Sequence, residues 1–297
     1  MELTALCVGQ ASVDWVGAVP RLSGWTGDRQ ELSAFTLQGG GGAANVAATL
    51  ARLGGKVRFG GKLPDDYLGS FAADSLAEEG VDLSYLKRQV GGVPPVSFIA
   101  LDGELRRRTV FFTRGDCEDL RPSDVSAAAL EGVRLLYVDG AFPEAQLQLV
   151  KLARAKGVRS FLGARTMGPL VRELAACCDV VVASEEFARE LSPMVPRALA
   201  ELLSLGAQVA LVTLGDDGSV GQEKNGEPVR VEAHPTKLVD ATGAGDVYRG
   251  ALAFAWLEGM GLREQMRFAS AAAALKCQAY GARAGLPTIE AVQAALG

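Results

Sequence analysis

Apolar residues along the chain fall into short runs that alternate with longer helical patterns. Leu3–Val8 is an apolar run that ends at Gly9, as expected for an inner strand of a parallel sheet. The same pattern predicts strands at Val57–Gly61, Leu135–Val138, Val158–Leu162, Val180–Ala183 and Val209–Leu214. Helices are predicted at Tyr67–Glu79, Pro143–Ala155, Gly168–Ala176, Glu185–Leu191 and Arg197–Leu205. Strands separated by helices predict an α/β fold, a doubly wound and mainly parallel sheet with helices on both faces.

Other segments do not follow this alternation of strands and helices. Val13–Val19 and Gln30–Leu37 alternate apolar and polar residues and are interrupted by Pro20, Gly24 and Gly27. Further strands are predicted as a hairpin of Val96–Leu101 with Thr109–Phe112, and as a second hairpin through Asn225-Gly226. We therefore expect one domain over residues 1–297, with a small β-sheet lid inserted from about 12–37 and 93–113.

Composition and charge narrow the class of protein. The 297 residues are 48% hydrophobic and 22% charged, with a net charge of -5, which argues against a nucleic-acid partner. Five cysteines without paired spacing indicate reduced thiols in a cytoplasmic protein. No apolar run is long enough to span a membrane. His234 is the only histidine, which excludes Ser-His-Asp hydrolysis and multi-histidine metal sites.

The segment Asp240-Ala-Thr-Gly-Ala-Gly-Asp246 precedes a long apolar helix pattern. A glycine turn that enters a helix exposes unpaired N–H groups and the positive end of the helix dipole, so it predicts an anion site. Asp246 places a carboxylate beside that site, where it can accept a proton from an attacking hydroxyl. The alternative is an ordinary helix N-terminus with a tight glycine turn.

A run of four glycines, Gly39–Gly42, precedes a second helix pattern of small residues. Glycine lets a ligand approach the main chain, and Asn45 lies one turn into the helix. Asp14 falls just beyond the first strand, at the sheet edge where ligands bind in this fold class. The alternative is a flexible loop. Ala271–Leu275, within a predicted helix over Leu262–Tyr280, suits either a flat ring or close helix packing.

Gly39–Ala47 and Asp240–Asp246 together resemble the paired signatures of the ribokinase/PfkB family of carbohydrate kinases, and the resemblance covers essentially the whole chain. The tail Arg267–Pro287, with Asp240–Leu252 and Ala183–Glu185, looks most like the bacterial sulfofructose kinase branch. The resemblance implies a ribokinase-like fold and transfer of the γ-phosphoryl group of ATP to a hydroxymethyl group of a sugar.

The resemblance also implies roles for single residues. Asp246 would be the base, and the backbone of Gly243, Ala244 and Gly245 would form the anion hole. The sugar would meet Asp14, Gly40, Gly41 and Asn45, and Arg165 is a candidate contact to an acidic acceptor. The nucleotide would lie near Ser184, Thr213, Gly215, Gly218, Ala273 and Cys277. Mg²⁺ would accompany ATP, with Glu186 in its network, and K⁺ could bind at Asp240 and Thr242. The lid sheet would join two copies as a homodimer.

Three segments depart from the family pattern. Ser184–Phe187 stands where many relatives have Asn-x-x-Glu, and Leu162–Arg165 stands where many have Asp-x-Asn-x-Arg. An arginine expected for a sulfonate is replaced near Gly140-Ala141. Two other functions stay open: a nucleoside kinase, which the low aromatic content of 6% disfavours, and a non-catalytic sugar- or nucleotide-sensing protein.

Overall fold

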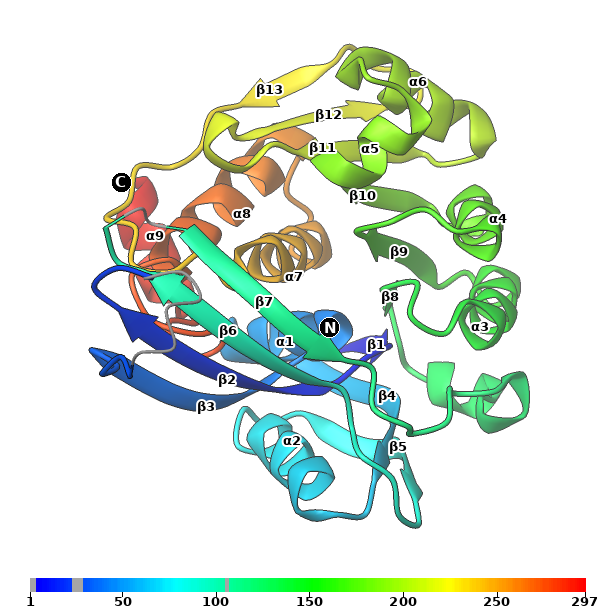
Figure 1. Ribbon diagram of the computed structural model, residues 1–297. Coiled ribbons are helices and arrows are strands. Elements are labelled where there is room, and N and C mark those ends of the chain that lie inside the picture. Colours follow the sequence, from blue (N-terminus) through cyan, green and yellow to red (C-terminus); the bar gives the residue numbers. More distant parts are fainter. Residues whose placement is uncertain (1–3, 23–28, 105–106) are drawn as a thin grey trace.

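The computed structural model describes residues 4–22, 29–104 and 107–297, and Figure 1 shows them as two sheets with covering helices. The large sheet consists of β1 (Thr4–Val8), β4 (Lys56–Pro64), β5 (Asp82–Gln89), β8 (Leu135–Val138), β9 (Arg159–Ala164), β10 (Val180–Ser184), β11 (Val209–Thr213), β12 (Ser219–Glu223) and β13 (Val229–Val231). Their spatial order is β13-β12-β11-β10-β9-β8-β1-β4-β5. Neighbours from β11 to β5 pair in parallel, and β12 and β13 form an antiparallel edge. The predicted α/β architecture is confirmed.

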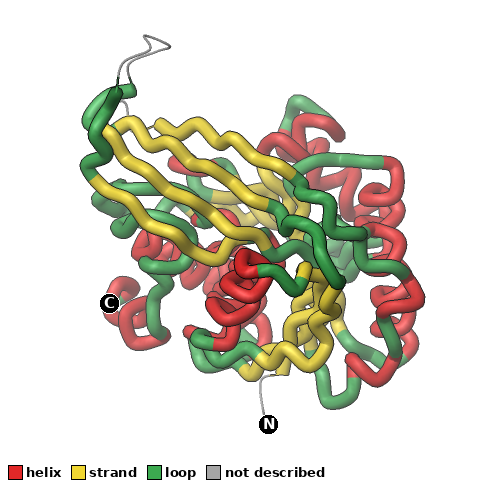
Figure 2. The backbone as a smooth tube through the Cα atoms, turned by 60° about the horizontal axis from the view of Figure 1, so that its bottom comes forward, coloured by secondary structure: helices red, strands yellow, loops and turns green. Residues whose placement is uncertain are grey.

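The small sheet is separate, and Figure 2 shows its strands as a plate beside the main body. It consists of β2 (Ser12–Val19), β3 (Ala34–Gly40), β6 (Val96–Asp102) and β7 (Arg107–Thr113), in the order β3-β2-β6-β7. The predicted hairpin is therefore present. Gly24 and Gly27 lie outside the described residues, and the extent of the domain stays a prediction.

Helices cover both faces of the large sheet (Figure 1). One face carries α1 (Gly42–Arg52), α2 (Tyr67–Ala77), α7 (Ala244–Leu257), α8 (Leu262–Lys276) and α9 (Ile289–Leu296), and the other carries α3 (Pro143–Ala155), α4 (Pro169–Cys177), α5 (Glu185–Leu191) and α6 (Val195–Leu205). Short 3-10 turns are η1 (Pro122–Asp124), η2 (Ala127–Leu130) and η3 (Gly215–Asp217). No described helix is long and apolar enough to cross a membrane.

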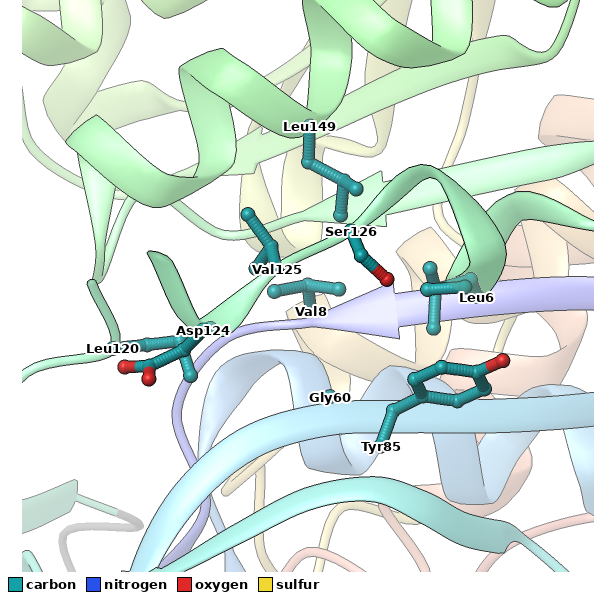
Figure 3. Close-up of a pocket in the computed structure, with 10 residues that line it drawn as sticks. Leu6, Val8, Gly60, Tyr85, Leu120, Asp124, Val125, Ser126 and Leu149 are labelled. Atoms are coloured by element: carbon teal, nitrogen blue, oxygen red, sulfur yellow. The ribbon is translucent and has the colours of Figure 1, made fainter. Parts of the chain in front are cut away.

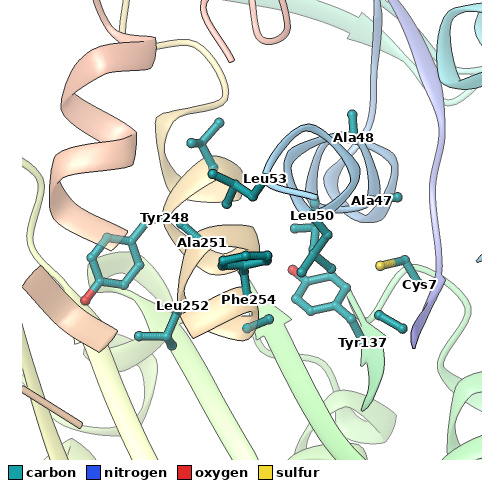
Figure 4. Packing of buried hydrophobic residues seen from close by; sticks show 14 of the residues in the cluster. Cys7, Ala47, Ala48, Leu50, Leu53, Tyr137, Tyr248, Ala251, Leu252 and Phe254 are labelled. Carbon is teal, nitrogen blue, oxygen red and sulfur yellow. The ribbon is translucent and has the colours of Figure 1, made fainter. Parts of the chain in front are cut away.

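The strands supply two hydrophobic cores because successive side chains point to opposite faces. In β1, Ala5 and Cys7 join the core under α1 and α7, whereas Leu6 and Val8 join the core under α3 to α6. Figure 4 shows Leu50 of α1 close to Tyr137 of β8 within the first core. Both faces of the central strands are buried, which explains their continuous apolar runs.

Several element boundaries differ from the sequence predictions. Gly39 and Gly40 belong to β3 rather than to a loop, because their small size admits side chains packed against the strand. The edge strand β5 was missed because it carries no apolar run, and α9 was missed because only Val292 of it is buried. α8 ends at Lys276 rather than at Tyr280, and the chain then turns through Gly281, whose φ is 79°.

Candidate active site

Polar side chains line the edge of the large sheet where its parallel strands end. Asp139 follows β8, Arg165 follows β9, and Ser184 and Thr213 are the last residues of β10 and β11. This is the edge at which doubly wound sheets bind ligands. α7 approaches the same edge from the far end of the sequence, because Nη2 of Arg249 donates to the carbonyl of Ala164, the last residue of β9, at 3.4 Å.

Asp246 lies in the first turn of α7 and is held by two side chains. Nδ2 of Asn45 in α1 donates to one carboxylate oxygen at 2.9 Å. Nη1 of Arg249 contacts the other oxygen at 3.2 Å, one turn further along α7. The Arg249 side chain is 4% exposed and that of Asp246 is 17% exposed, so this ion pair is largely shielded from water. The pairing of Asp246 with Asn45 agrees with a shared site, whereas sequence reasoning missed Arg249.

The glycine turn before α7 presents free backbone donors. Gly243 has a φ of 75°, a left-handed conformation, and α7 begins at Ala244. The N–H of Ala244 donates to the carbonyl of Ala241 at 3.2 Å. Within the described part of the chain, the N–H groups of Gly243 and Gly245 donate to no acceptor. Two of the three predicted anion-hole donors are therefore available, and the third is used inside the turn.

Asp240 stabilises this turn through hydrogen bonds to its carboxylate and its main-chain carbonyl. Its Oδ1 accepts the N–H and the hydroxyl of Thr242 at 2.8 and 2.7 Å, and its Oδ2 accepts the N–H of Gly281 at 2.8 Å. Nζ of Lys276 donates to the Asp240 carbonyl at 2.7 Å. Both residues predicted to bind K⁺ are thus engaged by groups of the protein itself, and the lysine already places a positive charge at that carbonyl.

Arg283 ties the segment after α8 to the first glycine run. Its Nε donates to Oδ1 of Asn45 at 3.1 Å, its Nη1 to Ser75 at 2.6 Å, and its Nη2 to the carbonyl of Gly40 at 3.1 Å. Burial lowers the pKa of Arg283 to about 10, so it is still charged at neutral pH. Asn45 is therefore fixed between Arg283 and Asp246. The only sequence signal for this arginine was its position between two glycines, in Gly281-Ala-Arg-Ala-Gly285.

The glycines of the first run are required by close neighbours. A Cβ on Gly40 would overlap the carboxylate of Asp14, and a Cβ on Gly39 would overlap Arg283. Gly41 has a φ of 95°, which strains any other residue. The glycine run is therefore tightly packed, and the absence of side chains there leaves room for the polar groups of the site.

Asp14 in β2 is buried at 6% exposure, and its carboxylate lies against Gly40 of the first glycine run. Its carboxylate accepts the hydroxyl of Ser12 at 3.1 Å, and Ser97 is its neighbour across β2 and β6. Burial raises the pKa of Asp14 above its usual value, and the hydrogen bonds only partly offset that effect. Within the described ranges, one hydroxyl donates to this buried carboxylate, which leaves it well suited to accept hydrogen bonds from a polyhydroxylated ligand.

Asp139 is a half-buried carboxylate that sequence reasoning missed. It accepts the N–H groups of Gln10, Ala43 and Ala141 at 2.8, 3.1 and 2.9 Å, and Nε2 of Gln146 at 2.9 Å. Desolvation raises the pKa of Asp139, opposed by these donors. Since it holds the start of α1 to the end of β8, it positions Asn45 without carrying a ligand-binding motif.

The residues predicted to border the nucleotide occupy the other half of the sheet edge. Ser184 caps α5 by accepting the Phe187 N–H at 3.1 Å, and its hydroxyl donates to the carbonyl of Arg165 at 3.0 Å. Ser184 pairs with Thr213 across β10 and β11. The others are Gly215 and Gly218 in the turn after β11, Ala273 on α8 and Cys277 at its end. Neighbours of Ala273 in the alanine run pack into the core, as the helix-packing alternative predicted.

A cavity of about 270 Å³ separates the small sheet from the turn before α7. Arg107 and Arg108 of β7 line it on one side, and Asp240 and Ala241 on the other. The lining thus combines these two arginines with the carboxylates of Asp102 and Asp240, next to the turn before α7. A second cavity, of about 20 Å³ and lined by Leu6, Val8 and Tyr85, is shown in Figure 3. It holds about one water and is too small for a sugar.

No cluster of three or more His, Cys, Asp or Glu side chains that could hold a metal occurs within the described ranges. Glu186, predicted to belong to a magnesium network, is exposed on α5.

Comparison with known proteins agrees with this architecture. The sequence model described as "pfkB family carbohydrate kinase" matches residues 3–289. A ribokinase of Arabidopsis thaliana is 30% identical over 302 residues, covering 96% of this chain and 79% of that protein. A 5-dehydro-2-deoxygluconokinase of Clostridium perfringens is 24% identical over 278 residues, covering 86% and 82%. The structure of Arabidopsis thaliana ribokinase complexed with ribose and ATP superposes with a TM-score of 0.86 at 26% identity, covering 100% of this chain and 99% of that chain.

Proposed function

Because the chain belongs to the pfkB family of carbohydrate kinases, we propose that Asp246 is the base that activates a sugar hydroxymethyl group for attack on the γ-phosphate of ATP. One observation carries this assignment. The Asp246 carboxylate, held by Asn45 and Arg249, lies within the same helix turn as the free N–H groups of Gly243 and Gly245. A proton acceptor and an anion site are thus adjacent, which phosphoryl transfer requires.

The mechanism follows from that arrangement. A carboxylate is a weak base towards an alcohol, so the proton moves to Asp246 late, as the new O–P bond forms. Loose phosphoryl transfer tolerates this order because positioning and charge stabilisation supply most of the rate. The N–H groups of Gly243 and Gly245 donate to the transferred phosphoryl oxygens, and losing one such donor typically costs about 3–4 kcal/mol.

The acceptor is a small polyhydroxylated molecule bound between Asp14, Asn45 and Asp246. Relatives named ribokinase and 5-dehydro-2-deoxygluconokinase make a pentose and a sugar acid the first acceptors to test. The likeness of the tail to sulfofructose kinases adds a sulfonated sugar. Arg165, exposed at the end of β9, is the contact proposed for an acidic group on the acceptor.

ATP lies along the ends of β10 and β11, near Ser184, Thr213, Gly215, Gly218, Ala273 and Cys277. Arg107 and Arg108 of the small sheet add positive charge where the phosphates approach the turn before α7. Mg²⁺ bound with the nucleotide would neutralise part of the phosphate charge, and Glu186 would belong to its outer environment.

Two copies of the chain associate through the small sheet. Trp15, Phe98 and Phe111 are paired neighbours across β2, β6 and β7, and are 38%, 45% and 49% exposed. Their shared parity places them on the face opposite to Asp14. An exposed aromatic row of this kind favours a protein interface.

The protein acts in the cytoplasm, as its unpaired cysteines suggest.

A panel assay tests the function. ATP consumption is measured with ribose, fructose, 5-dehydro-2-deoxygluconate, sulfofructose and a nucleoside, alongside thermal melting with each compound. We expect one sugar or sugar acid to stimulate ADP release and to raise the melting temperature. Melting shifts without turnover would instead favour a sensing protein, and turnover of the nucleoside alone would favour a nucleoside kinase.

A further inference from the structure

Lys276, the last residue of α8, carries its charge inside the protein. Its side chain has a relative exposure of 0%, and it is the only lysine among the buried charged residues of the described chain. Nζ donates to the carbonyl oxygen of Asp240 at 2.7 Å, and it forms no ion pair with a carboxylate in the described ranges. The charge thus faces a main-chain carbonyl, the type of ligand that replaces the hydration shell of a monovalent cation in proteins.

The main chain of Asp240 is held on both sides by the end of α8. Its N–H donates to the carbonyl of Cys277 at 3.1 Å, and the N–H of Val239 donates to the same oxygen at 2.8 Å. Its C=O accepts from Lys276. Together these bonds fix the orientation of the peptide group between Asp240 and Ala241.

That peptide group begins the anion-binding turn. The carbonyl of Ala241 accepts the N–H of Ala244, which closes the turn. The N–H groups of Gly243 and Gly245 are left free by this arrangement. A charge that orients the Asp240 carbonyl therefore acts on the position of both donors.

The residues around Asp240 do not fit a potassium ion while Lys276 is charged. Oδ1 of Asp240 is occupied by two donors of Thr242, and Oδ2 by the N–H of Gly281. An ion bound to the Asp240 carbonyl would share that oxygen with Nζ of Lys276. Two positive charges so close in a buried, weakly screened site repel strongly.

We propose that the Lys276 ammonium takes the place of a monovalent cation in this chain and fixes the anion-binding turn, so that phosphoryl transfer needs no added potassium. Lys276 is a positioning residue, because it contacts the turn rather than a substrate. The kinetic consequence rests on the proposed kinase function, whereas cation binding depends only on the groups around Asp240.

The first experiment compares chloride salts at constant ionic strength. Wild-type activity is measured with about 100 mM K⁺, Na⁺ or choline as the only added cation, a concentration that screens surface charges equally. We expect the three rates to agree within about twofold, since no binding energy is gained from the ion. A severalfold activation by K⁺ over choline would overturn the proposal.

The second experiment removes the charge and leaves space. Without K⁺, Lys276→Ala should lose about tenfold or more in kcat, with a smaller change in KM for ATP, because the misplaced donors serve the transition state. K⁺ or ethylammonium should restore much of the loss, and choline, which is too large, should not. A loss that no small cation restores would indicate a purely structural lysine and would overturn the proposal.

Two variants serve as controls. Lys276→Met removes the charge but fills the space, so we expect a similar loss of kcat without rescue by K⁺. Lys237→Ala removes an exposed lysine from the loop that leads to Asp240, and it should keep full activity in every salt.

Thermal melting without substrate tests cation binding independently of catalysis. K⁺ should raise the melting temperature of Lys276→Ala above its value in choline, and should leave that of the wild type unchanged, because only a site that binds the ion is stabilised by it. If the wild type phosphorylates no acceptor, the proposed function fails, but this comparison still holds. Equal K⁺ stabilisation of both proteins would overturn the proposal, as would stabilisation of the wild type alone. If Lys276→Ala does not fold, the response of wild-type melting to K⁺ decides.

Discussion

At the scale of single residues, the site is a chain of hydrogen-bonded side chains drawn from distant parts of the sequence. Arg283 holds Asn45, and Asn45 holds Asp246. Residues next to glycine signatures could be predicted, because the local pattern itself indicates a ligand site. Arg249, Arg283 and Lys276 could not, because their partners are set by tertiary contacts and their own sequence neighbourhoods read as ordinary helix or turn.

The variant Asp14→Asn distinguishes the effect of Asp14 on the sugar acceptor from its effect on folding stability. Removing the charge from the acceptor site should lower kcat/KM for the sugar about tenfold or more, since hydrogen bonds to a charged group contribute roughly 1.5–3 kcal/mol. The variant should nevertheless melt at the same or a higher temperature at pH 7, because it removes a buried charge. A normal kcat/KM for the acceptor would remove Asp14 from the sugar site.

The pH dependence of that stability difference follows from the raised pKa of Asp14. Between the usual aspartate value and the raised folded value, the native state binds more protons than the unfolded state, so this group makes stability fall as pH rises. The advantage of Asp14→Asn should therefore grow as pH rises through this window and level off above it. Denaturant titrations on both sides of the window measure this. An advantage that shrinks as pH rises would contradict the assigned direction.

At the scale of elements, the start of α7 is the functional feature of the fold. Regular βα units were predicted well because their strands are buried on both faces and their helices are amphipathic. The boundaries of β3 and α8 were not predicted, because they depend on tertiary contacts. Gly39 and Gly40 pack against Arg283 and Asp14, and the end of α8 is hydrogen-bonded to the loop before α7.

Gly245→Val tests the anion site at the start of α7. An added Cβ would meet only Nη1 of Arg249, at 3.7 Å, so the fold should tolerate it. The side chain would crowd the phosphoryl site, and kcat should fall by about a hundredfold or more, as for lost oxyanion donors. Gly261→Val, at the start of α8, is the matched control and should keep its activity, because its Cβ would meet nothing closer than 3.9 Å. Equal activity of both variants would contradict the anion hole.

At the scale of the whole molecule, the two faces of the small sheet carry different side chains and have different proposed roles. Its inner face presents Asp14 to the site, and its outer face exposes the aromatic row of Trp15, Phe98 and Phe111. The sequence predicted this sheet from alternating patterns. It could not show which face looks outward, because that depends on how the sheet docks on the main body.

The double variant Phe98→Glu, Phe111→Glu should be monomeric if the small sheet joins two copies, because charges in the row oppose its burial. Light scattering after gel filtration measures the mass. Tyr67→Glu, at a 77% exposed aromatic on α2, is the control and should keep the wild-type mass. A wild-type mass for the double variant would place the interface elsewhere.

The most direct test of the central assignment is the turnover of Asp246→Asn with the acceptor found in the panel. Asparagine keeps the shape of the side chain but cannot take the hydroxyl proton, so kcat should fall by about two orders of magnitude or more. Calorimetry should show nearly unchanged ATP binding, since the residues proposed to border the nucleotide lie on other elements. Turnover close to the wild-type rate, with ATP binding intact, would show that Asp246 is not the base.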